Sequence, residues 1–278
     1  MDHLYVASGS PRFGRALSLG CGKGHLERAM VRLGIASEVD AIDGSAVSIE
    51  LARAKADEEG FTTVHYRQAD LNQLDLPRNT YDAVVFHQSL HHVSSVEKLL
   101  ERVRRSLKPN GLLFLDEWTG PSRFEWSAKK LARASGLFES VPAAWKKWPE
   151  CRPPIEAADP SEAVRSSAIL PAVHRLFSTV LERPYGGHVV ALLLPQLARE
   201  RAPAAELDAI ISRWLEAEDQ DLERNRDAGF YTALVASPRR GLRLIAGRTA
   251  NLGVRVLLAF RYRVWARVGG SPAHASDA

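Results

Sequence analysis

The chain has 278 residues, of which 45% are hydrophobic, 25% are charged and two are cysteines. A chain of this size and apolar content buries roughly 75% of its surface on folding, which excludes a disordered protein, a collagen and a disulfide scaffold. The positive net charge of +4 comes from residues 239–270, which hold eight arginines and no acid. Residues 1–238 carry 29 basic and 32 acidic groups. This part of the chain therefore lacks the excess of basic residues that broad nucleic-acid binding needs.

Short apolar runs alternate with helical patterns in the first part of the chain. The apolar runs predict strands at 16–19, 39–42, 63–67, 81–86 and 111–115. Apolar residues at helical spacing predict helices at 25–33, 45–59 and 96–107. Strands that alternate with helices in this way form a parallel sheet covered on both faces. Residues 1–117 therefore predict a doubly wound α/β core.

The alternation stops after this core. Residues 118–158 contain four of the six tryptophans and five prolines, which indicates an irregular, partly helical cap. Asp159 followed by Pro160 has the form of a helix start and predicts a helix toward His174. We expect two more strands and two helical stretches before residue 238, namely strands at 177–182 and 230–235 and helices at 187–199 and 204–226.

Three glycines lie between the first strand and the first helix, in the segment Leu17–Glu27. Glycines at such a junction let the backbone approach a ligand and adopt positive φ, and the helix that follows presents unpaired N–H groups. The spacing G-x-G-x-G differs from the G-x-G-x-x-G of dinucleotide sites. A tight turn without any ligand is the alternative interpretation.

Two acidic residues follow the next two strands. Asp43 ends the second strand, where its carboxylate can accept hydrogen bonds from both hydroxyls of a ribose. Asp70 ends the third strand, where it can meet an adenine amino group. Because two carboxylates would repel phosphates, the expected ligand is a neutral or cationic nucleoside.

These segments together resemble the class I S-adenosylmethionine-dependent methyltransferases. The motifs that carry the resemblance are 17–24, 39–45, Ala69–Leu71, 81–85 with Leu90–His92, and 107–111. The resemblance implies a seven-stranded, mostly parallel Rossmann-like sheet with an antiparallel last strand. Helical cap insertions would follow strand five and separate strands six and seven. The chain departs from the family pattern at Ser18, where an acid is usual, and at Asn110, where glycine is usual.

The resemblance also implies S-adenosylmethionine as the cofactor. Gly20 and Gly22 would line its methionine part, and Asp43 would bind its ribose. Asp70 and the backbone N–H of Leu71 would recognise its adenine. The other residues expected at the cofactor are Cys21, whose thiol we expect to be inert, Gly24 and His87.

Methyl transfer depends mainly on alignment in a site without water, but a hydroxyl acceptor must also lose its proton. His91 and His92 follow strand four and Glu117 follows strand five, at the sheet edge where ligands bind. We therefore take these three as the candidate catalytic residues, since histidine is the natural base near neutral pH. The alternatives are a scaffolding role for the histidines and a helix cap or an Arg123 partner for Glu117. No sequence spacing matches a metal site, so a metal-independent reaction is expected.

A second resemblance concerns the acceptor. Residues 116–121, 159–163 and 185–187, with Arg123, Phe124 and Trp126, resemble bacterial methyltransferases that tailor sugars and glycans. A hydroxyl of a small molecule, with a sugar or glycan favoured, is therefore the expected acceptor. The cap tryptophans would stack on it or form the core of the cap. The alternatives are N- or C-methylation of a metabolite, a nicotinamide oxidoreductase, and a relative that binds the nucleoside without turnover.

The remaining feature is the segment 239–278. From Leu242 to Val268, apolar residues recur every three or four positions, with arginines on the opposite face. Such a basic amphipathic helix would contact an anionic membrane or a partner protein, or would pack on its own domain or be poorly ordered. A membrane contact would suit a lipid-linked glycan acceptor. The few cysteines and the lack of a leader predict a cytoplasmic protein, peripheral to the inner membrane face if the tail binds there.

Overall fold

The structure is a computed structural model that describes residues 13–152, 159–225 and 229–238. The expected arginine tail lies outside the described residues. Seven strands form one sheet in the order β3-β2-β1-β4-β5-β7-β6. The strands are β1 (Phe13–Leu19), β2 (Ala36–Asp43), β3 (Val64–Gln68), β4 (Tyr81–His87), β5 (Leu107–Trp118), β6 (Ser178–Tyr185) and β7 (Tyr231–Ser237).

The first five strands are parallel to one another, and β7 is antiparallel to both β5 and β6. This confirms the predicted doubly wound, mostly parallel sheet. Because all its carboxyl ends face one way, the parallel part brings residues that follow β1, β2, β3, β4 and β5 to one edge.

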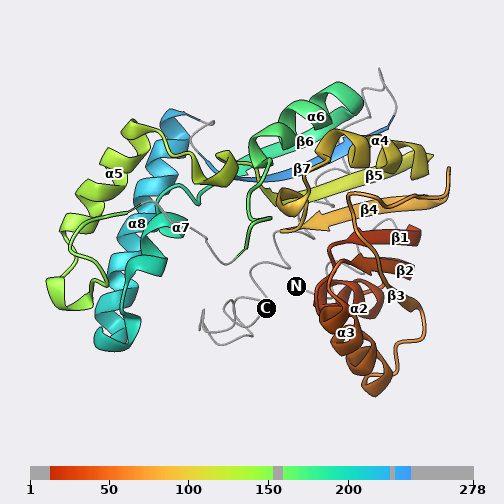
Figure 1. Cartoon of the computed structure of the whole chain (residues 1–278), viewed down its shortest axis with the longest axis horizontal. Coiled ribbons are helices and arrows are strands. Elements are labelled where there is room, and N and C mark those ends of the chain that lie inside the picture. The colour runs from red at the N-terminus through yellow and green to blue at the C-terminus, as the bar shows by residue number, and fades with distance from the viewer. Residues whose placement is uncertain (1–12, 153–158, 226–228, 239–278) are drawn as a thin grey trace.

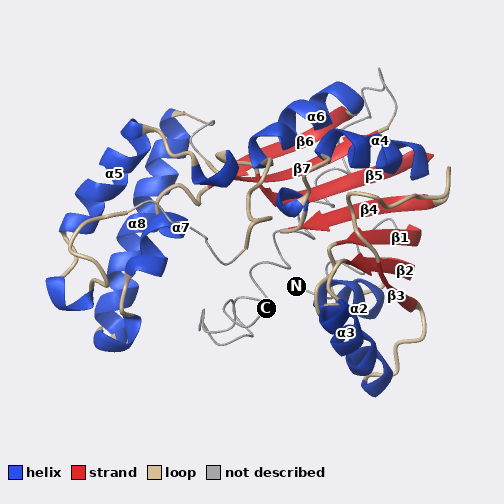
Figure 2. Ribbon diagram, in the orientation of Figure 1, coloured by secondary structure: helices blue, strands red, loops and turns tan. Residues whose placement is uncertain are grey.

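Helices cover both faces of the sheet (Figures 1 and 2). On one face, α2 (His25–Arg32) and α3 (Ala46–Glu58) pack through a core that includes Met30, Ile49 and Val39. On the other face, α4 (Val96–Ser106) and α6 (Ile169–Leu176) lie side by side over a core that includes Leu17, Val84 and Leu99. Central strands such as β1 and β4 carry apolar residues on both sides for this reason.

The insertions build a separate group of helices beyond the carboxyl ends of the strands (Figure 1). It consists of α5 (Ala128–Glu139), α7 (Val190–Leu193) and α8 (Ala204–Arg224). Their common core contains Phe138, Leu193 and Trp214. Six 3-10 turns connect the elements, at Leu90–His92, Ser122–Phe124, Ala143–Trp145, Ser166–Ala168, Leu194–Gln196 and Arg199–Arg201.

Two of the predicted helices are wrong in extent. The helix expected from Asp159 begins at Ile169. The Asp159 carboxylate does accept the Ser161 N–H at 2.8 Å, but Ala163 adopts a left-handed φ of 47°, which ends the turn. The stretch predicted at 187–199 is the short α7 followed by two 3-10 turns, the first of which has Pro195 at its start.

None of the helices within the described ranges combines the length and the apolar character that a membrane span requires.

The cap tryptophans differ in their surroundings. Trp118 packs edge-to-face on Phe230 and Tyr231, and Trp145 lies in the core of the helical group. Trp148, in contrast, is exposed. For Trp118 and Trp145 the structure therefore favours the core alternative over stacking on an acceptor.

Candidate active site

The glycine loop after β1 uses its backbone N–H groups inside the protein. Four of them donate to protein acceptors: Gly20 and Cys21 to the Ile42 carbonyl at 2.7 and 3.2 Å, Gly22 to the Asp43 carboxylate at 2.8 Å, and Gly24 to the Cys21 carbonyl at 3.0 Å. A pyrophosphate site needs such N–H groups free to meet the ligand. The loop is thus poorly suited to a dinucleotide, which argues against the oxidoreductase alternative.

The loop also leaves room for a ligand at one point. All three glycines have positive φ, but a Cβ on Gly20 would lie 2.2 Å from the Ser89 Cβ and one on Gly24 would lie 2.3 Å from the Tyr66 hydroxyl. A Cβ on Gly22, in contrast, would meet nothing within 4 Å. Gly22 therefore presents bare backbone to open space, which suits the approach of a ligand.

Asp43 ends β2 as predicted, whereas Asp70 lies two residues beyond the end of β3 at Gln68. The half-buried Asp43 accepts the Ser45 N–H at 2.8 Å in addition to that of Gly22. The exposed Asp70 accepts the Asn72 N–H at 2.9 Å. An ionised carboxylate has about four acceptor positions, so both groups retain capacity for ligand hydroxyl or amino groups. Their assigned roles, and those of Gly20, Leu71 and the rest of the cofactor set, stay predictions.

A buried carboxyl group lies next to Ser18, the position where the family pattern has an acid. The Ser18 hydroxyl donates to Oε1 of Glu27 at 2.5 Å, and Oε2 of the fully buried Glu27 has no hydrogen-bond partner among the described residues. Burial raises the pKa of Glu27 to about 7, against the lowering effect of the Ser18 hydrogen bond. Glu27 was not among the predicted site residues, because an acid in the first turn of a helix is ordinarily exposed.

Burial also raises the pKa of the Cys21 thiol, and the carboxyl groups of Glu27 and Asp43 raise it further. The thiolate is the reactive form of cysteine. The structure therefore agrees with the expected inert thiol.

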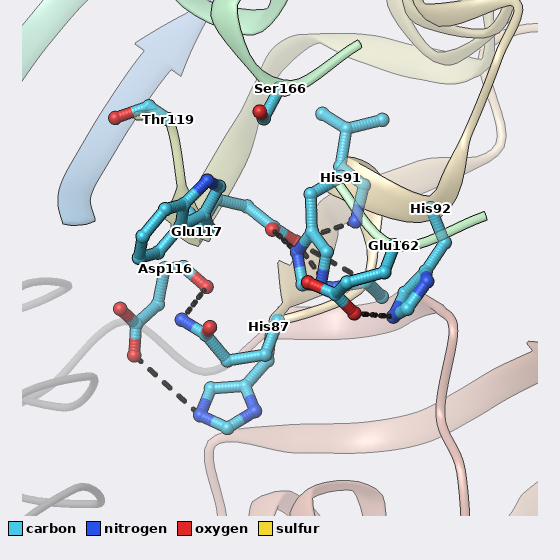
Figure 3. A network of polar contacts seen from close by, with 12 residues as sticks. His87, His91, His92, Asp116, Glu117, Thr119, Glu162 and Ser166 are labelled. Carbon is cyan, nitrogen blue, oxygen red and sulfur yellow. Dashed lines mark hydrogen bonds and ion pairs between the residues drawn. The ribbon is translucent and has the colours of Figure 1, made fainter. Parts of the chain in front are cut away.

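A group of polar side chains lies at the carboxyl ends of β4 and β5, where β5 extends to Trp118 and thus includes Glu117, which was expected to follow it (Figure 3). We call it the histidine–carboxylate cluster, and its members are His91, His92, Glu117 and Glu162. Glu117 is fully buried, and its Oε1 accepts the N–H groups of Ser89 at 2.6 Å and Leu90 at 2.7 Å. Its Oε2 lies 2.8 Å from Nδ1 of His91. The structure thus brings together all three predicted catalytic residues.

Glu162 joins the cluster from the insertion that precedes α6. Its Oε1 lies 3.6 Å from Nε2 of His91, and its Oε2 lies 3.6 Å from Nε2 of His92. Nδ1 of His92 lies 3.0 Å from the Ser161 hydroxyl. Burial lowers the pKa of His91, but Glu117 and Glu162 together outweigh it and the net direction is upward. Glu162 was missed because no local spacing connects it to the histidines.

His87 lies apart from this cluster, at the end of β4. Its Nε2 is 3.5 Å from the buried Asp116 carboxylate (Figure 3). That carboxylate also accepts a hydrogen bond from the Tyr185 hydroxyl. The predicted contact of His87 with the cofactor stays a prediction. His25, beside the loop, is exposed on α2.

Comparison with known proteins gives a family for the core. Residues 17–115 match the family model described as a methyltransferase domain. The ubiquinone biosynthesis O-methyltransferase of Chelativorans sp. (strain BNC1) is 38% identical over 101 residues, which cover 36% of this chain and 39% of that protein. The chain spans about half or less of the length of the curated relatives it matches.

Solved structures extend the likeness of the fold beyond this region. The phosphoethanolamine N-methyltransferase 2 of Haemonchus contortus, solved with S-adenosyl-L-methionine, has a TM-score of 0.52 and 16% identity over 86% of this chain and 52% of that chain. The [4+2]-cyclase SpnF has a TM-score of 0.51 and 22% identity over 86% of this chain and 82% of that chain. Over the glycine loop and the strands that follow it, residues 17–115 of the chain are thus similar to a methyltransferase domain.

Proposed function

We propose that the protein transfers a methyl group from S-adenosylmethionine to a hydroxyl of a small molecule, with a sugar or glycan favoured. The observation that carries the proposal is the histidine–carboxylate cluster at the carboxyl ends of β4 and β5. A hydroxyl must lose its proton as it is methylated, whereas an amine needs mainly positioning. The 38%-identical relative is named an O-methyltransferase, which supports an oxygen acceptor.

The residues of the chain fit the cofactor on the side of β1, β2 and β3. Gly22 offers open backbone, and the carboxylates of Asp43 and Asp70 lie at successive strand ends. We assign the methionine part to the loop, the ribose to Asp43 and the adenine to Asp70 and Leu71. The cofactor supplies a methyl carbon on a positively charged sulfur, so the acceptor oxygen forms the new C–O bond while the C–S electron pair stays on sulfur.

The proton of the acceptor hydroxyl is assigned to the histidine–carboxylate cluster. His91 and His92 are the proposed catalytic residues. Glu117 is a positioning residue, because its two oxygens already accept two backbone N–H groups and contact the His91 ring. This differs from the catalytic role that its sequence position suggested.

Affinity for S-adenosylhomocysteine, measured by calorimetry, tests the cofactor assignment. We expect Asp43→Asn to weaken binding by about 10–100-fold, because a neutral amide accepts hydrogen bonds from the ribose less strongly than a carboxylate. Asp57→Asn, on the exposed side of α3, is the matched control and should bind like the wild type. Equal affinity of the Asp43 variant would show that the cofactor lies elsewhere.

The kind of acceptor is tested by His92→Gln. Methyl transfer that tolerates this change would favour N- or C-methylation, which needs no base. Tight cofactor binding without turnover of any acceptor would favour a non-catalytic relative. One structural neighbour with a similar fold is described as a cyclase, not as a methyltransferase.

We also retain the proposal that 239–268 contacts an anionic membrane or a partner protein, as a lipid-linked acceptor would require. Deletion of 239–278 is then expected to reduce co-sedimentation with anionic liposomes. Unchanged co-sedimentation would remove the membrane part of the proposal.

A further inference from the structure

Both imidazoles of the histidine–carboxylate cluster direct the same ring atom at one carboxylate. Nε2 of His91 and Nε2 of His92 each lie 3.6 Å from a different oxygen of Glu162 (Figure 3). These separations exceed those of hydrogen bonds, which end near 3.2 Å. The ligand atoms of the three residues all lie within 4.8 Å of one another. Two nitrogens and an oxygen this close could converge on one ion, at bond lengths of about 2.0–2.2 Å, after a small movement of the side chains.

The second nitrogen of each ring is held by an acceptor, which fixes the tautomer. Nδ1 of His91 contacts the Glu117 carboxylate at 2.8 Å, so this nitrogen carries the proton. The Ser161 hydroxyl donates to Asp159 at 2.6 Å, so its oxygen accepts from Nδ1–H of His92 at 3.0 Å. Histidine ligands of metals are ordinarily held in this way, by a hydrogen bond from the nitrogen that does not bind the metal.

Acidic groups surround the two Nε2 atoms. The Glu162 carboxylate faces both of them, and Asp159 lies 3.6 Å from His92 on the other side. The His174–Glu182 pair of this chain, in contrast, is a direct contact with an N–O distance of 2.7 Å. The longer N–O separations in the histidine–carboxylate cluster leave space for a cation between the groups.

From this geometry we propose that His91, His92 and Glu162 bind a divalent transition-metal ion. Two imidazoles with one carboxylate suit Zn²⁺ better than Mg²⁺, which prefers oxygen ligands. Three protein ligands leave a coordination position open, as in catalytic zinc sites. With the ion bound, His91 and His92 would serve as its ligands instead of as bases, and an acceptor hydroxyl at the open position would release its proton to the second oxygen of Glu162 or to solvent. The binding of the ion stands on the geometry, whereas its use in methyl transfer rests on the proposed function.

The test is a metal titration of the 278-residue protein after treatment with a chelator. Visible absorption follows Co²⁺ uptake, and Zn²⁺ is added as a competitor. We expect the wild type to take up Co²⁺ at this site and Zn²⁺, but not equimolar Mg²⁺, to displace it. Glu162→Gln and His92→Gln should weaken uptake by at least roughly 100-fold, and Ser161→Ala by about 10-fold, as for groups that orient a ligand. His174→Gln, which removes a different histidine–carboxylate contact, is the matched control and should leave uptake unchanged.

Two results would overturn the metal proposal. One is Co²⁺ uptake that is equal in the wild type and Glu162→Gln, and the other is no uptake by a protein that circular dichroism shows to be folded. Titration of the same samples with S-adenosylhomocysteine distinguishes the metal proposal from the proposed function. A wild-type protein that does not bind S-adenosylhomocysteine would contradict the proposed methyltransferase activity but would not affect the conclusion on metal binding.

Discussion

Replacement of Glu117 by alanine is expected to lower the free energy of unfolding by about 3–5 kcal/mol, as for other buried partners of charged groups. The change leaves the N–H groups of Ser89 and Leu90 without their acceptor and removes the carboxylate that holds Nδ1 of His91. Unsatisfied buried N–H groups each cost about 1–3 kcal/mol. Urea denaturation at neutral pH measures the difference.

Glu117→Gln separates the hydrogen bonds from the charge. The amide oxygen can still accept both backbone N–H groups, so the expected loss is smaller, about 1–2 kcal/mol. Glu101→Ala removes an exposed glutamate from α4 and should change the stability by less than about 0.5 kcal/mol. A Glu117→Ala protein as stable as Glu101→Ala would contradict the assigned role of Glu117 in holding the loop after β4.

Glu27 is expected to make the protein less stable as the pH rises from 5 to 8. Its pKa in the folded protein is about 7, above the ordinary value of 4.5, so the folded state binds the proton more tightly than the unfolded state. The stabilisation is complete below pH 4.5 and is lost as the pH rises through 7. At about 1.4 kcal/mol per pH unit, the loss amounts to about 3 kcal/mol.

Glu27→Gln cannot ionise and should not show this loss. We expect its free energy of unfolding to be close to that of the wild type at pH 5 and about 3 kcal/mol higher at pH 8. Urea denaturation across this pH range provides the comparison, with the exposed Glu50→Gln as the control. Parallel profiles for wild type and Glu27→Gln would mean that Glu27 ionises normally in the folded protein.

The core of the fold could be predicted because its signals are local. The strands β1, β2, β4 and β5 contain short apolar runs, β3 alternates between buried and exposed residues, and each helix between them shows an apolar face, so periodicity identifies them. The number of strands and the antiparallel β7 came from family resemblance, whereas the order of the strands came from the structure. Beyond β5 the local signals were misleading, since Asp159 and Pro160 form a good helix start but Ala163 turns the chain away.

The candidate site was predictable only where it follows the strand ends. Asp43, His91, His92 and Glu117 were found because a parallel sheet brings the residues after its strands to one edge. Glu162 reaches the histidines through the path of an insertion, and Glu27 depends on which face of α2 turns inward. Neither arrangement produces a recognisable spacing of residues in the sequence. The expectation of a metal-independent reaction was therefore made without Glu162.

The hydrogen bonding of the glycine loop has a consequence for selectivity in the cell. With the N–H groups of Gly20, Cys21, Gly22 and Gly24 used internally and carboxylates at the adjoining strand ends, a polyanion finds few donors and a repulsive field there. ATP and NAD, which share the adenosine moiety, are thereby disfavoured by the backbone itself. Discrimination among abundant adenine compounds would then need no dedicated side chain to reject them.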